Sequence, residues 1–348
     1  MSLINTRLTN FRADAPADKW ETRAGSYGFL DLFQSQSLDP MGIITDDLRQ
    51  KAIAAAGSVL QIPVIDYDAS LAITNVTQPV TITGSPSTSQ VYAVTFVDYY
   101  FGFLIHPAQH FNNEISMQRE FNTKLNAYII ALMQALDVAG AASLEAAKTQ
   151  VLTDTLGGRY SLASNVIVAP LAEQDAVIGD INPMMRGNKF AGPFDVVANP
   201  SMESLVRNRL MEKGAFNTDN KEYQYSDKTW HFTTNLANAS GHKATAFAVQ
   251  KGSLGMLQQF APDNVMRNRT SKHTWDTEIL PIINLEMGTY GYEDAVDGSA
   301  LSGAATALLT ATKVQAYGFH SRIAFIVPYN SAPSTNASAI AKIAVATT

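Results

Sequence analysis

Two histidines and a glutamate recur at a spacing that could bind a metal ion. His106, His110 and Glu114 are each four residues apart. On one helix, this spacing would bring two imidazoles and a carboxylate to the same face, as in many zinc sites. Pro107 lies between the histidines and favours a helix start after His106, which removes the first ligand from that face. The order also lacks His-Glu-x-x-His, in which the glutamate supplies a general base. We therefore expect no metal site here.

Other residue types that support catalysis occur without the partners that the chemistry needs. Gly157-Gly158-Arg159 lacks both the Gly-Lys-Ser/Thr of a phosphate loop and Gly-x-Gly-x-x-Gly, so we expect a turn. No Gly-x-Ser-x-Gly elbow occurs. Adjacent carboxylates and isolated histidines have no patterned partners; they are Asp46, Asp47, Glu293, Asp294, His231, His242, His273 and His320. The sequence predicts no catalytic residue and no cofactor, which counts against an enzyme but leaves an unrecognised site open.

The charge balance argues against tight nucleic-acid binding. The formal net charge is −6, from 25 Lys and Arg against 31 Asp and Glu. Wrapping nucleic acid needs clusters of Lys and Arg that displace counterions. The densest basic cluster consists of Arg267, Arg269, Lys272 and His273, which we interpret as a solvated or intersubunit patch. We expect only non-specific contact with DNA.

Composition favours a protein with large covered surfaces. The 348 residues are 46% apolar and only 16% charged, against about 25% charged in ordinary soluble domains. Interface cores are depleted in charge, so low charge fits coverage by neighbouring subunits; a neutral-surfaced monomer is the alternative. The absence of cysteine removes disulfides, thiolate catalysis and cysteine metal sites. We see no secretory signal and no apolar run of about 18 residues, so we expect a cytosolic protein without membrane contact.

The main predicted element of the chain is a long amphipathic helix over residues 111–138, which would position the side chain of Glu114. Its apolar positions recur in steps of three, four and seven; they are Phe111, Ile115, Phe121, Leu125, Tyr128, Ile129, Leu132, Met133 and Leu136. Asn112 or Asn113 is predicted to cap its start, with Glu114 in the first turn, where the helix dipole favours a negative charge. Gly140 is predicted to end it. Such a helix would be roughly 40 Å long.

The segments before this helix predict extended arms. Residues 1–40 show little periodicity, with scattered aromatic residues: Phe11, Trp20, Tyr27, Phe29 and Phe33. We expect an arm that cannot bury these rings on itself and therefore lies on another surface. A short helix is predicted over 45–56, capped by Thr45. Strand patterns follow at 59–65, 72–76, 80–83 and 90–97, with turn residues at 84–87. A two-stranded ribbon is marginal alone in water, so we expect it to lie across another chain.

The segments after the long helix predict a mixed body. A second helix is predicted over 144–151, capped by Ser143. The predicted strands are 165–169, 194–198, 230–234, 244–249, 279–286 and 314–327, and the predicted helices are 171–179, 201–213 and 252–260. Residues 332–348 could form a last strand or a loose tail. The alternation of strand, break and helix indicates an α+β or α/β class.

This order of parts resembles the major capsid protein of tailed double-stranded DNA bacteriophages, the Hong Kong ninety-seven type fold. The arm, ribbon, long helix and body are similar to that family's N-arm, E-loop, P-domain spine helix and A-domain. Local stretches are similar too; they are NVIVAP at 165–170, DVVANP at 195–200, TAFAVQKGSLG at 245–255, and WD at 275–276 with GTYG at 288–291. The resemblance covers nearly the whole chain, and the order of parts carries most of its weight.

The resemblance implies an α+β fold in five segments. They are an N-terminal arm (1–45), an E-loop β-hairpin with a flanking helix (46–105), a P-domain spine helix (106–155), an A-domain (156–270), and strands returning to the P-domain with a C-terminal tail (271–348). The chain goes almost directly into its arm, so we expect no fused scaffolding region.

It also implies a function that is structural rather than enzymatic. Copies would self-assemble through the N-arm and E-loop into pentamers and hexamers of an icosahedral shell around packaged double-stranded DNA. The protein would belong to the virion capsid and assemble in the bacterial host cytoplasm, with separate scaffolding, portal and decoration proteins as candidate partners. The alternatives are an encapsulin-like shell protein of a bacterial nanocompartment, and a cytosolic enzyme that would form a compact monomer or small oligomer.

Overall fold

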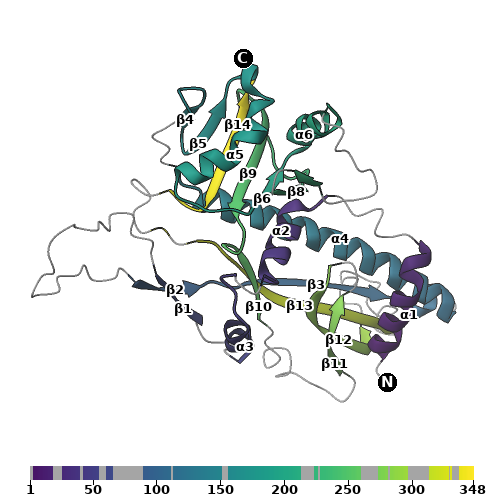
Figure 1. The fold of residues 1–348 in the computed structure, drawn as a ribbon. Coiled ribbons are helices and arrows are strands. Elements are labelled where there is room, and N and C mark those ends of the chain that lie inside the picture. The colour runs from purple at the N-terminus through teal and green to yellow at the C-terminus, as the bar shows by residue number, and fades with distance from the viewer. Residues whose placement is uncertain are drawn as a thin grey trace, which may run out of the picture.

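Two β-sheets and one long helix form the framework of the chain. The computed structural model describes residues 3–18, 26–39, 42–54, 60–65, 89–110, 113–150, 156–212, 223–225, 228–259, 273–280, 283–296, 313–328, 330 and 337–348. The helices are α1 (Leu3–Asp18), α2 (Gly28–Ser37), α3 (Asp46–Ala54), α4 (Glu114–Ala147), α5 (Ala176–Gly187) and α6 (Pro200–Glu212), with 3₁₀ helices at Pro107–His110 and Leu171–Glu173. Figure 1 shows α4 lying along the lower sheet and reaching the upper one. The class is α+β, as predicted.

Helix α4 is longer than its sequence pattern suggested. Asn113 caps its start, because its Oδ1 accepts hydrogen bonds from the backbone N–H groups of Ile115 (3.0 Å) and Ser116 (3.2 Å). The prediction that Gly140 ends the helix is wrong, since α4 continues for seven residues beyond it. The separate helix predicted over 144–151 is the last turn of α4, and the Ser143 hydroxyl donates to the Ala139 carbonyl within it (2.9 Å) instead of capping.

Gly140 serves close packing rather than termination. A Cβ at this position would lie 3.3 Å from Phe29 Cβ and from ring atoms of Phe33. Both aromatic residues belong to α2, so the glycine lets the two helices approach closely. The buried neighbours of α4 compensate the weak helix propensity of glycine, which local sequence signals alone do not reveal.

The buried face of α4 supports the lower sheet. Phe121, Leu125, Ile129 and Leu136 are fully buried and share one core cluster with residues of α1, β3, β12 and β13. Ile115, which the pattern placed on this stripe, is 71% exposed. By length and composition alone α4 could cross a membrane. Its buried face packs against these elements.

The lower sheet is antiparallel throughout. Its order is β10 (Gly255–Gln259), β13 (Lys313–Ile326), β12 (Leu285–Val296) and β11 (His273–Leu280), while β3 (Val97–Ile105) pairs with β13 on its own. The helix predicted over 252–260 is wrong, because its second half is strand β10. The strand predicted over 279–286 is also wrong, because it spans the connection between β11 and β12. Strand pairing decided the local structure in both cases: β10 pairs with the distant β13, and β11 pairs with β12 across this connection.

The upper sheet has seven strands, two pairs of which are parallel. Its order is β4 (Ser161–Ala163), β5 (Val166–Ala169), β14 (Ile340–Ala346), β9 (His242–Gln250), β6 (Phe194–Ala198), β8 (Lys228–Phe232) and β7 (Tyr223–Tyr225). Residues of α5 and α6 pack on one face, and residues of α2 with the end of α4 pack on the other. The C-terminal segment, predicted as strand or tail, is strand β14 inside this sheet. Strand β10 falls within the predicted A-domain segment (156–270) but belongs to the lower sheet, and β14 falls within the predicted returning segment (271–348) but belongs to the upper sheet. The borders of the predicted segments remain a prediction.

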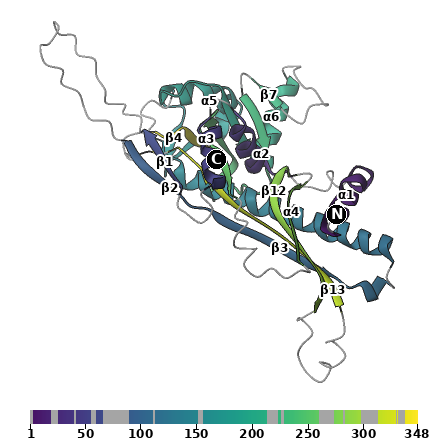
Figure 2. The ribbon, with the colours of Figure 1, turned by 90° about the horizontal axis from the view of Figure 1, so that it is seen from below.

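A two-stranded ribbon leaves the body beside the lower sheet. Strands β1 (Leu60–Ile65) and β2 (Ser89–Val94) pair antiparallel, with Ile65 opposite Ser89; they correspond to the strands predicted at 59–65 and 90–97. Their base packs on α3, β10 and β13 through a shared apolar cluster. Figure 2 shows β2 continuing into β3 along one edge of the molecule. The predicted strands at 72–76 and 80–83 lie outside the described residues.

The described part of the N-terminal segment is helical and packs on its own chain. The expectation that its rings cannot be buried there is therefore wrong for Phe11, Phe29 and Phe33, while the N-terminal arm of residues 1–45 remains a prediction. Ile4, Leu8 and Phe11 lie on one face of α1 and are buried in the core that includes α4. Phe29 and Phe33 of α2 are also fully buried. The spacing of four and three residues between Ile4, Leu8 and Phe11 is helical, and this signal was overlooked. Trp20 lies outside the described residues. The short helix predicted over 45–56 is confirmed as α3, where Thr45 Oγ1 accepts from the Leu48 N–H (3.3 Å).

Candidate assembly site

The candidate metal ligands are not brought together. His106 precedes the 3₁₀ turn, His110 ends it, and Glu114 begins α4. His110 and Glu114 have different partners: Nδ1 of His110 lies 2.6 Å from Ser116 Oγ, and Glu114 pairs with Arg7 at 2.8 Å. In the part of the chain that the structure describes, no three His, Asp or Glu side chains gather as a metal site would require.

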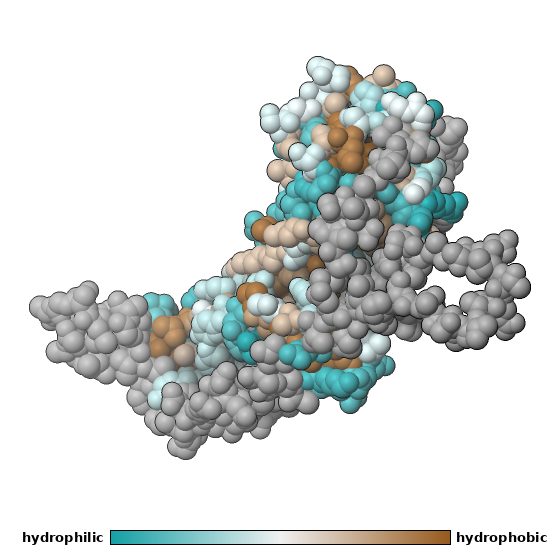
Figure 3. Space-filling view, turned by 90° about the vertical axis from the view of Figure 1, so that its left-hand side faces the viewer, coloured by the Kyte–Doolittle hydropathy of each residue, from teal (hydrophilic) through white to brown (hydrophobic). Residues whose placement is uncertain are grey.

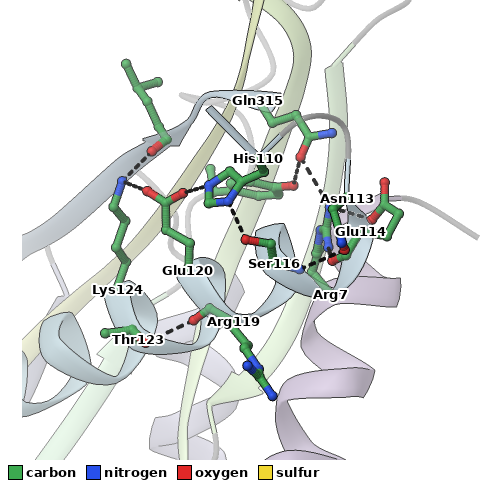
Figure 4. Close-up of polar contacts among 12 residues, drawn as sticks. Arg7, His110, Asn113, Glu114, Ser116, Arg119, Glu120, Thr123, Lys124 and Gln315 are labelled. Carbon is green, nitrogen blue, oxygen red and sulfur yellow. Dashed lines mark hydrogen bonds and ion pairs between the residues drawn. The ribbon is translucent and has the colours of Figure 1, made fainter. Parts of the chain in front are cut away.

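A polar cluster at the start of α4 holds the helix against the sheet instead. Figure 4 shows His110 lying between Ser116 and Glu120, with Lys124 on the far side of Glu120. Lys124 Nζ lies 2.5 Å from Glu120 and donates to the Leu104 carbonyl at the end of β3 (2.7 Å). Partial burial would raise the pKa of Glu120, but hydrogen bonds and charge from Lys124 and His110 outweigh it. The pKa of Glu120 is therefore below its ordinary value.

This cluster resembles a serine–histidine–carboxylate group in composition, yet its surroundings are structural. A catalytic serine needs backbone N–H donors free to bind an oxyanion. The N–H groups of Ile115 and Ser116 in this turn are already bound by Asn113 Oδ1. Glu120 is also shared with Lys124. The arrangement therefore joins α4 to β3 rather than activating Ser116.

A buried arginine joins α1 to both α4 and the lower sheet. Arg7 is 3% exposed and donates to Gln118 Oε1 (3.2 Å) and Gln315 Oε1 (3.5 Å), besides its ion pair with Glu114 (Figure 4). Gln118 in turn donates to the Arg7 carbonyl at 3.0 Å. These contacts come from three elements, so they fix where α1 lies.

A buried aspartate joins α4 to α2 and to the upper sheet. Asp137 Oδ1 accepts from the N–H groups of Phe29 (2.8 Å) and Leu30 (3.0 Å) in the first turn of α2. Its Oδ2 accepts from the Thr233 hydroxyl (2.6 Å) and the Asn235 amide (2.8 Å), which follow β8. The carboxylate thus caps a helix from outside it and binds the edge of the upper sheet with its second oxygen.

A third contact links the two sheets through α2. The buried Gln36 donates to Asp195 of β6 (3.1 Å) and accepts from the Leu254 N–H immediately before β10 (3.0 Å). Sequence reasoning missed Arg7, Gln36 and Asp137. Of these, Asp137 had a visible signal, because an acidic residue between Leu136 and Val138 interrupts the apolar part of α4.

The other candidate residues named from the sequence contact structural partners, lie in strands, or lie outside the described residues. Gly157 and Gly158 form the expected turn, with φ of +74° and +78°, and Arg159 pairs with Asp180 at 2.8 Å. Asp46 and Asp47 pair with Arg49 and Lys51 in α3, and His320 contacts Asp98 at 3.2 Å. His231 lies in β8 and His242 in β9. Backbone positions alone are described for His273, Glu293 and Asp294; Arg267, Arg269 and Lys272 lie outside the described residues.

One open cavity has a mainly apolar lining, with the charged side chains of Arg49 and Glu286 among its lining residues. It has a volume of about 560 Å³ and lies between the end of α2, α3 and strands β10 to β12. The hydroxyl in its lining belongs to Ser37, which donates to the Phe33 carbonyl (2.6 Å) and accepts from the Met256 N–H (2.6 Å). Leu38 and Ile279 line the cavity as exposed apolar residues. The exposed Leu38 and Ile279 make the hollow suited to an apolar contact.

Comparisons with known proteins give likenesses of structure alone. No family model matches the chain, and no curated protein sequence matches it. The chain is similar to a structure from Mycobacterium phage Che8, with 10% identity, coverage of 85% of this chain and 88% of that chain, and a TM-score of 0.45. It is similar to the capsid asymmetric unit of cyanophage Pam1, with 13% identity, coverage of 86% and 88%, and a TM-score of 0.45. It is also similar to the holo-SrpI encapsulin complex of Synechococcus elongatus PCC 7942, with 9% identity, coverage of 83% and 82%, and a TM-score of 0.38.

Proposed function

We propose that this chain is the building block of a closed protein shell, of the tailed-phage major capsid kind. The observation that carries the proposal is the course of residues 89–105. They return to the body as one strand of a ribbon and then become the edge strand of a sheet backed by the 34-residue helix α4. Within the described residues the ribbon packs on its own chain through Leu60, Ile62 and Val94. A two-stranded ribbon gains little stability by itself, so a neighbouring subunit could support it.

The surface of the chain supports many modest contacts. The exposed large apolar residues are spread over several elements; among them are Leu38, Val97, Tyr100, Ile115 and Ile279. On the face drawn in Figure 3, apolar residues form small patches separated by polar ones. Together with only 16% charged residues, this distribution fits a subunit with neighbours on several sides.

The polar joints give such a subunit a fixed shape. Arg7, Gln36 and Asp137 connect α1, α2, α4 and both sheets through buried hydrogen bonds. A subunit that packs repeatedly against its neighbours needs its own elements held in a constant arrangement. The finer parts of the proposal are pentamers and hexamers in an icosahedral shell that encloses double-stranded DNA. They also include non-specific DNA contact, assembly in the host cytoplasm, and separate scaffolding, portal or decoration proteins.

The proposal is tested first by electron microscopy and light scattering on the purified chain, alone and co-expressed with its neighbouring phage proteins. Rings of five or six, tubes or closed shells are the expected result. A chain that stays monomeric or dimeric even with those proteins would refute the shell function. Shells that hold a protein cargo instead of DNA would favour a nanocompartment.

A shortened ribbon tests the element that carries the proposal. Residues 66–88 are replaced by Asn-Gly, which suits a two-residue hairpin because Ile65 already lies opposite Ser89. We expect an unchanged unfolding midpoint and a loss of assembly. The matched control inserts Asn-Gly between Gly157 and Gly158, in an exposed turn, and should assemble normally. Normal shells from the shortened chain would contradict the role of the ribbon.

A further inference from the structure

Strand β3 has an unpaired edge along the side of the lower sheet. Its register with β13 runs from Val97 opposite Ile323 to Ile105 opposite Gln315. Among the strands that the structure describes, none pairs with its other edge. Figure 2 shows this edge lying at the outside of the molecule. An open edge presents unpaired backbone N–H and C=O groups, and proteins usually protect it or use it for binding.

The backbone edge of β3 is protected only near its C-terminal end, at Leu104. Lys124 Nζ donates to the Leu104 carbonyl and is held there by Glu120, so α4 occupies the edge where β3 ends. Ile105 is fully buried, whereas Val97 is 52% exposed and Tyr100 is 62% exposed. The open stretch of this edge, before the Lys124 contact, runs from Val97 to Phe103, which is about 23 Å of extended chain. Phe101 and Phe103 face the core, while the backbone edge of this stretch has no partner among the described strands.

The sheet face beside this open stretch carries a fixed aromatic surface. The rings of Tyr100 and Tyr290 stack with centroids 6.1 Å apart and planes 10° from parallel. They lie over the paired glycines Gly102 and Gly318, because a Cβ at Gly318 would come within 2.1 Å of the Tyr290 ring and one at Gly102 within 2.7 Å of the Tyr100 hydroxyl. Tyrosine in a fixed position is typical of the energetically important residues of interfaces.

The open stretch carries little charge that would repel a second strand. Asp98 is its one charged residue, and Asp98 is already paired with Arg322 at 2.9 Å and with His320 at 3.2 Å. Lysine and proline, the usual protection of edge strands, are both absent from 97–103. A neutral strand would therefore meet no electrostatic barrier here. The chain itself contains such material, since residues 69–97 include no Asp, Glu, Lys or Arg.

We infer that the open edge of β3, with the Tyr100–Tyr290 surface beside it, binds an extended strand of a second copy of this chain by backbone pairing. The inference rests on the proposed function, which supplies the second copy. Because Lys124 already occupies the Leu104 carbonyl, the added strand must end before Leu104. The surface thus fixes the register of the contact as well as its place.

The test places lysine on both faces of the open stretch. Val97 and Tyr100 lie three residues apart on a strand, so V97K and Y100K project to opposite faces. We expect the double variant to keep its far-UV circular dichroism spectrum and to lose at least tenfold in assembled mass. The control, L162K, changes an exposed apolar residue on β4 of the other sheet and should assemble like the unaltered chain.

Hydrogen exchange gives a second measurement on the unaltered protein. Amides within 97–103 should exchange at least tenfold more slowly in assembled particles than in the dissociated chain. Normal assembly of the double variant, unchanged exchange over 97–103, or an equal loss in L162K would overturn the inference while leaving the shell function intact. An unaltered chain that never assembles refutes the proposed function and the inference with it.

Discussion

Asp137 is the residue whose replacement tests the framework most directly. Its side chain is fully buried and accepts four hydrogen bonds, from Phe29, Leu30, Thr233 and Asn235. Asp137→Ala removes all four acceptor contacts at once. Asp137→Asn keeps one oxygen for the two backbone N–H groups and replaces the other oxygen by an amide donor.

The magnitudes differ because the two variants leave different groups unpaired. Alanine leaves the N–H groups of Phe29 and Leu30 buried without an acceptor, at about 1–3 kcal/mol each. Removing a buried carboxylate recovers part of this, because its desolvation no longer opposes folding. We expect a net loss of about 2–4 kcal/mol for alanine. Asparagine should lose about 1–2 kcal/mol, because the Thr233 hydroxyl can turn to accept while the Asn235 amide meets a second donor.

Urea denaturation followed by circular dichroism measures both values. The control is Asp46→Asn, whose carboxylate is exposed and pairs with Arg49 on the surface of α3; it should leave stability unchanged. The reasoning predicts the order alanine, then asparagine, then control. A loss below about 1 kcal/mol for alanine, or a greater loss for asparagine than for alanine, would show that Asp137 does not hold α2.

Three further changes probe the packing and the charge of α4. Gly140→Leu should destabilise the chain by about 1–3 kcal/mol in urea denaturation, because its first side-chain atom already meets α2; Gly179→Ala, in open space on α5, should instead stabilise by about 0.5–1 kcal/mol. Leu125→Asp buries an unpaired carboxyl at a fully buried position and should cost about 3–5 kcal/mol, and a native-like soluble variant would contradict the buried stripe. The pKa of Glu120 is lower in the folded chain than its ordinary 4.5, so its stabilisation is present above that pH and is lost as pH falls through the folded value. Glu120→Gln should therefore flatten the acid limb of a stability–pH curve, and an unchanged limb would refute the pairing.

Sequence periodicity predicted the elements whose apolar residues are close along the chain. The core of α4 from Phe121 to Leu136, the strand at Phe194–Ala198 and the antiparallel ribbon were all visible as regular patterns. The α1 face formed by Ile4, Leu8 and Phe11 was equally visible. That face is short, and the proline and glycine residues that follow it interrupt the apolar spacing.

The remaining features depend on contacts that no local pattern contains. Gly140 has the sequence signature of a helix end, yet α2 packs against it from more than 100 residues away. Strand β10 has a helix-compatible composition and becomes a strand because β13 pairs with it. The Tyr100–Tyr290 surface joins residues 190 positions apart over glycines from two strands. Tertiary pairing, rather than propensity, determines such places.

The continuous course of β2 and β3 gives the chain a mechanical property. A pull on the ribbon acts along the axis of β3, while the hydrogen bonds to β13 run perpendicular to that axis. The nine register pairs from Val97 to Ile105 are therefore strained together, in shear, instead of opening one after another. Lys124 adds a tether at the pair before the last, since it ties the Leu104 carbonyl to α4. Tension that enters at the ribbon is thus passed through the sheet edge to the longest helix of the molecule.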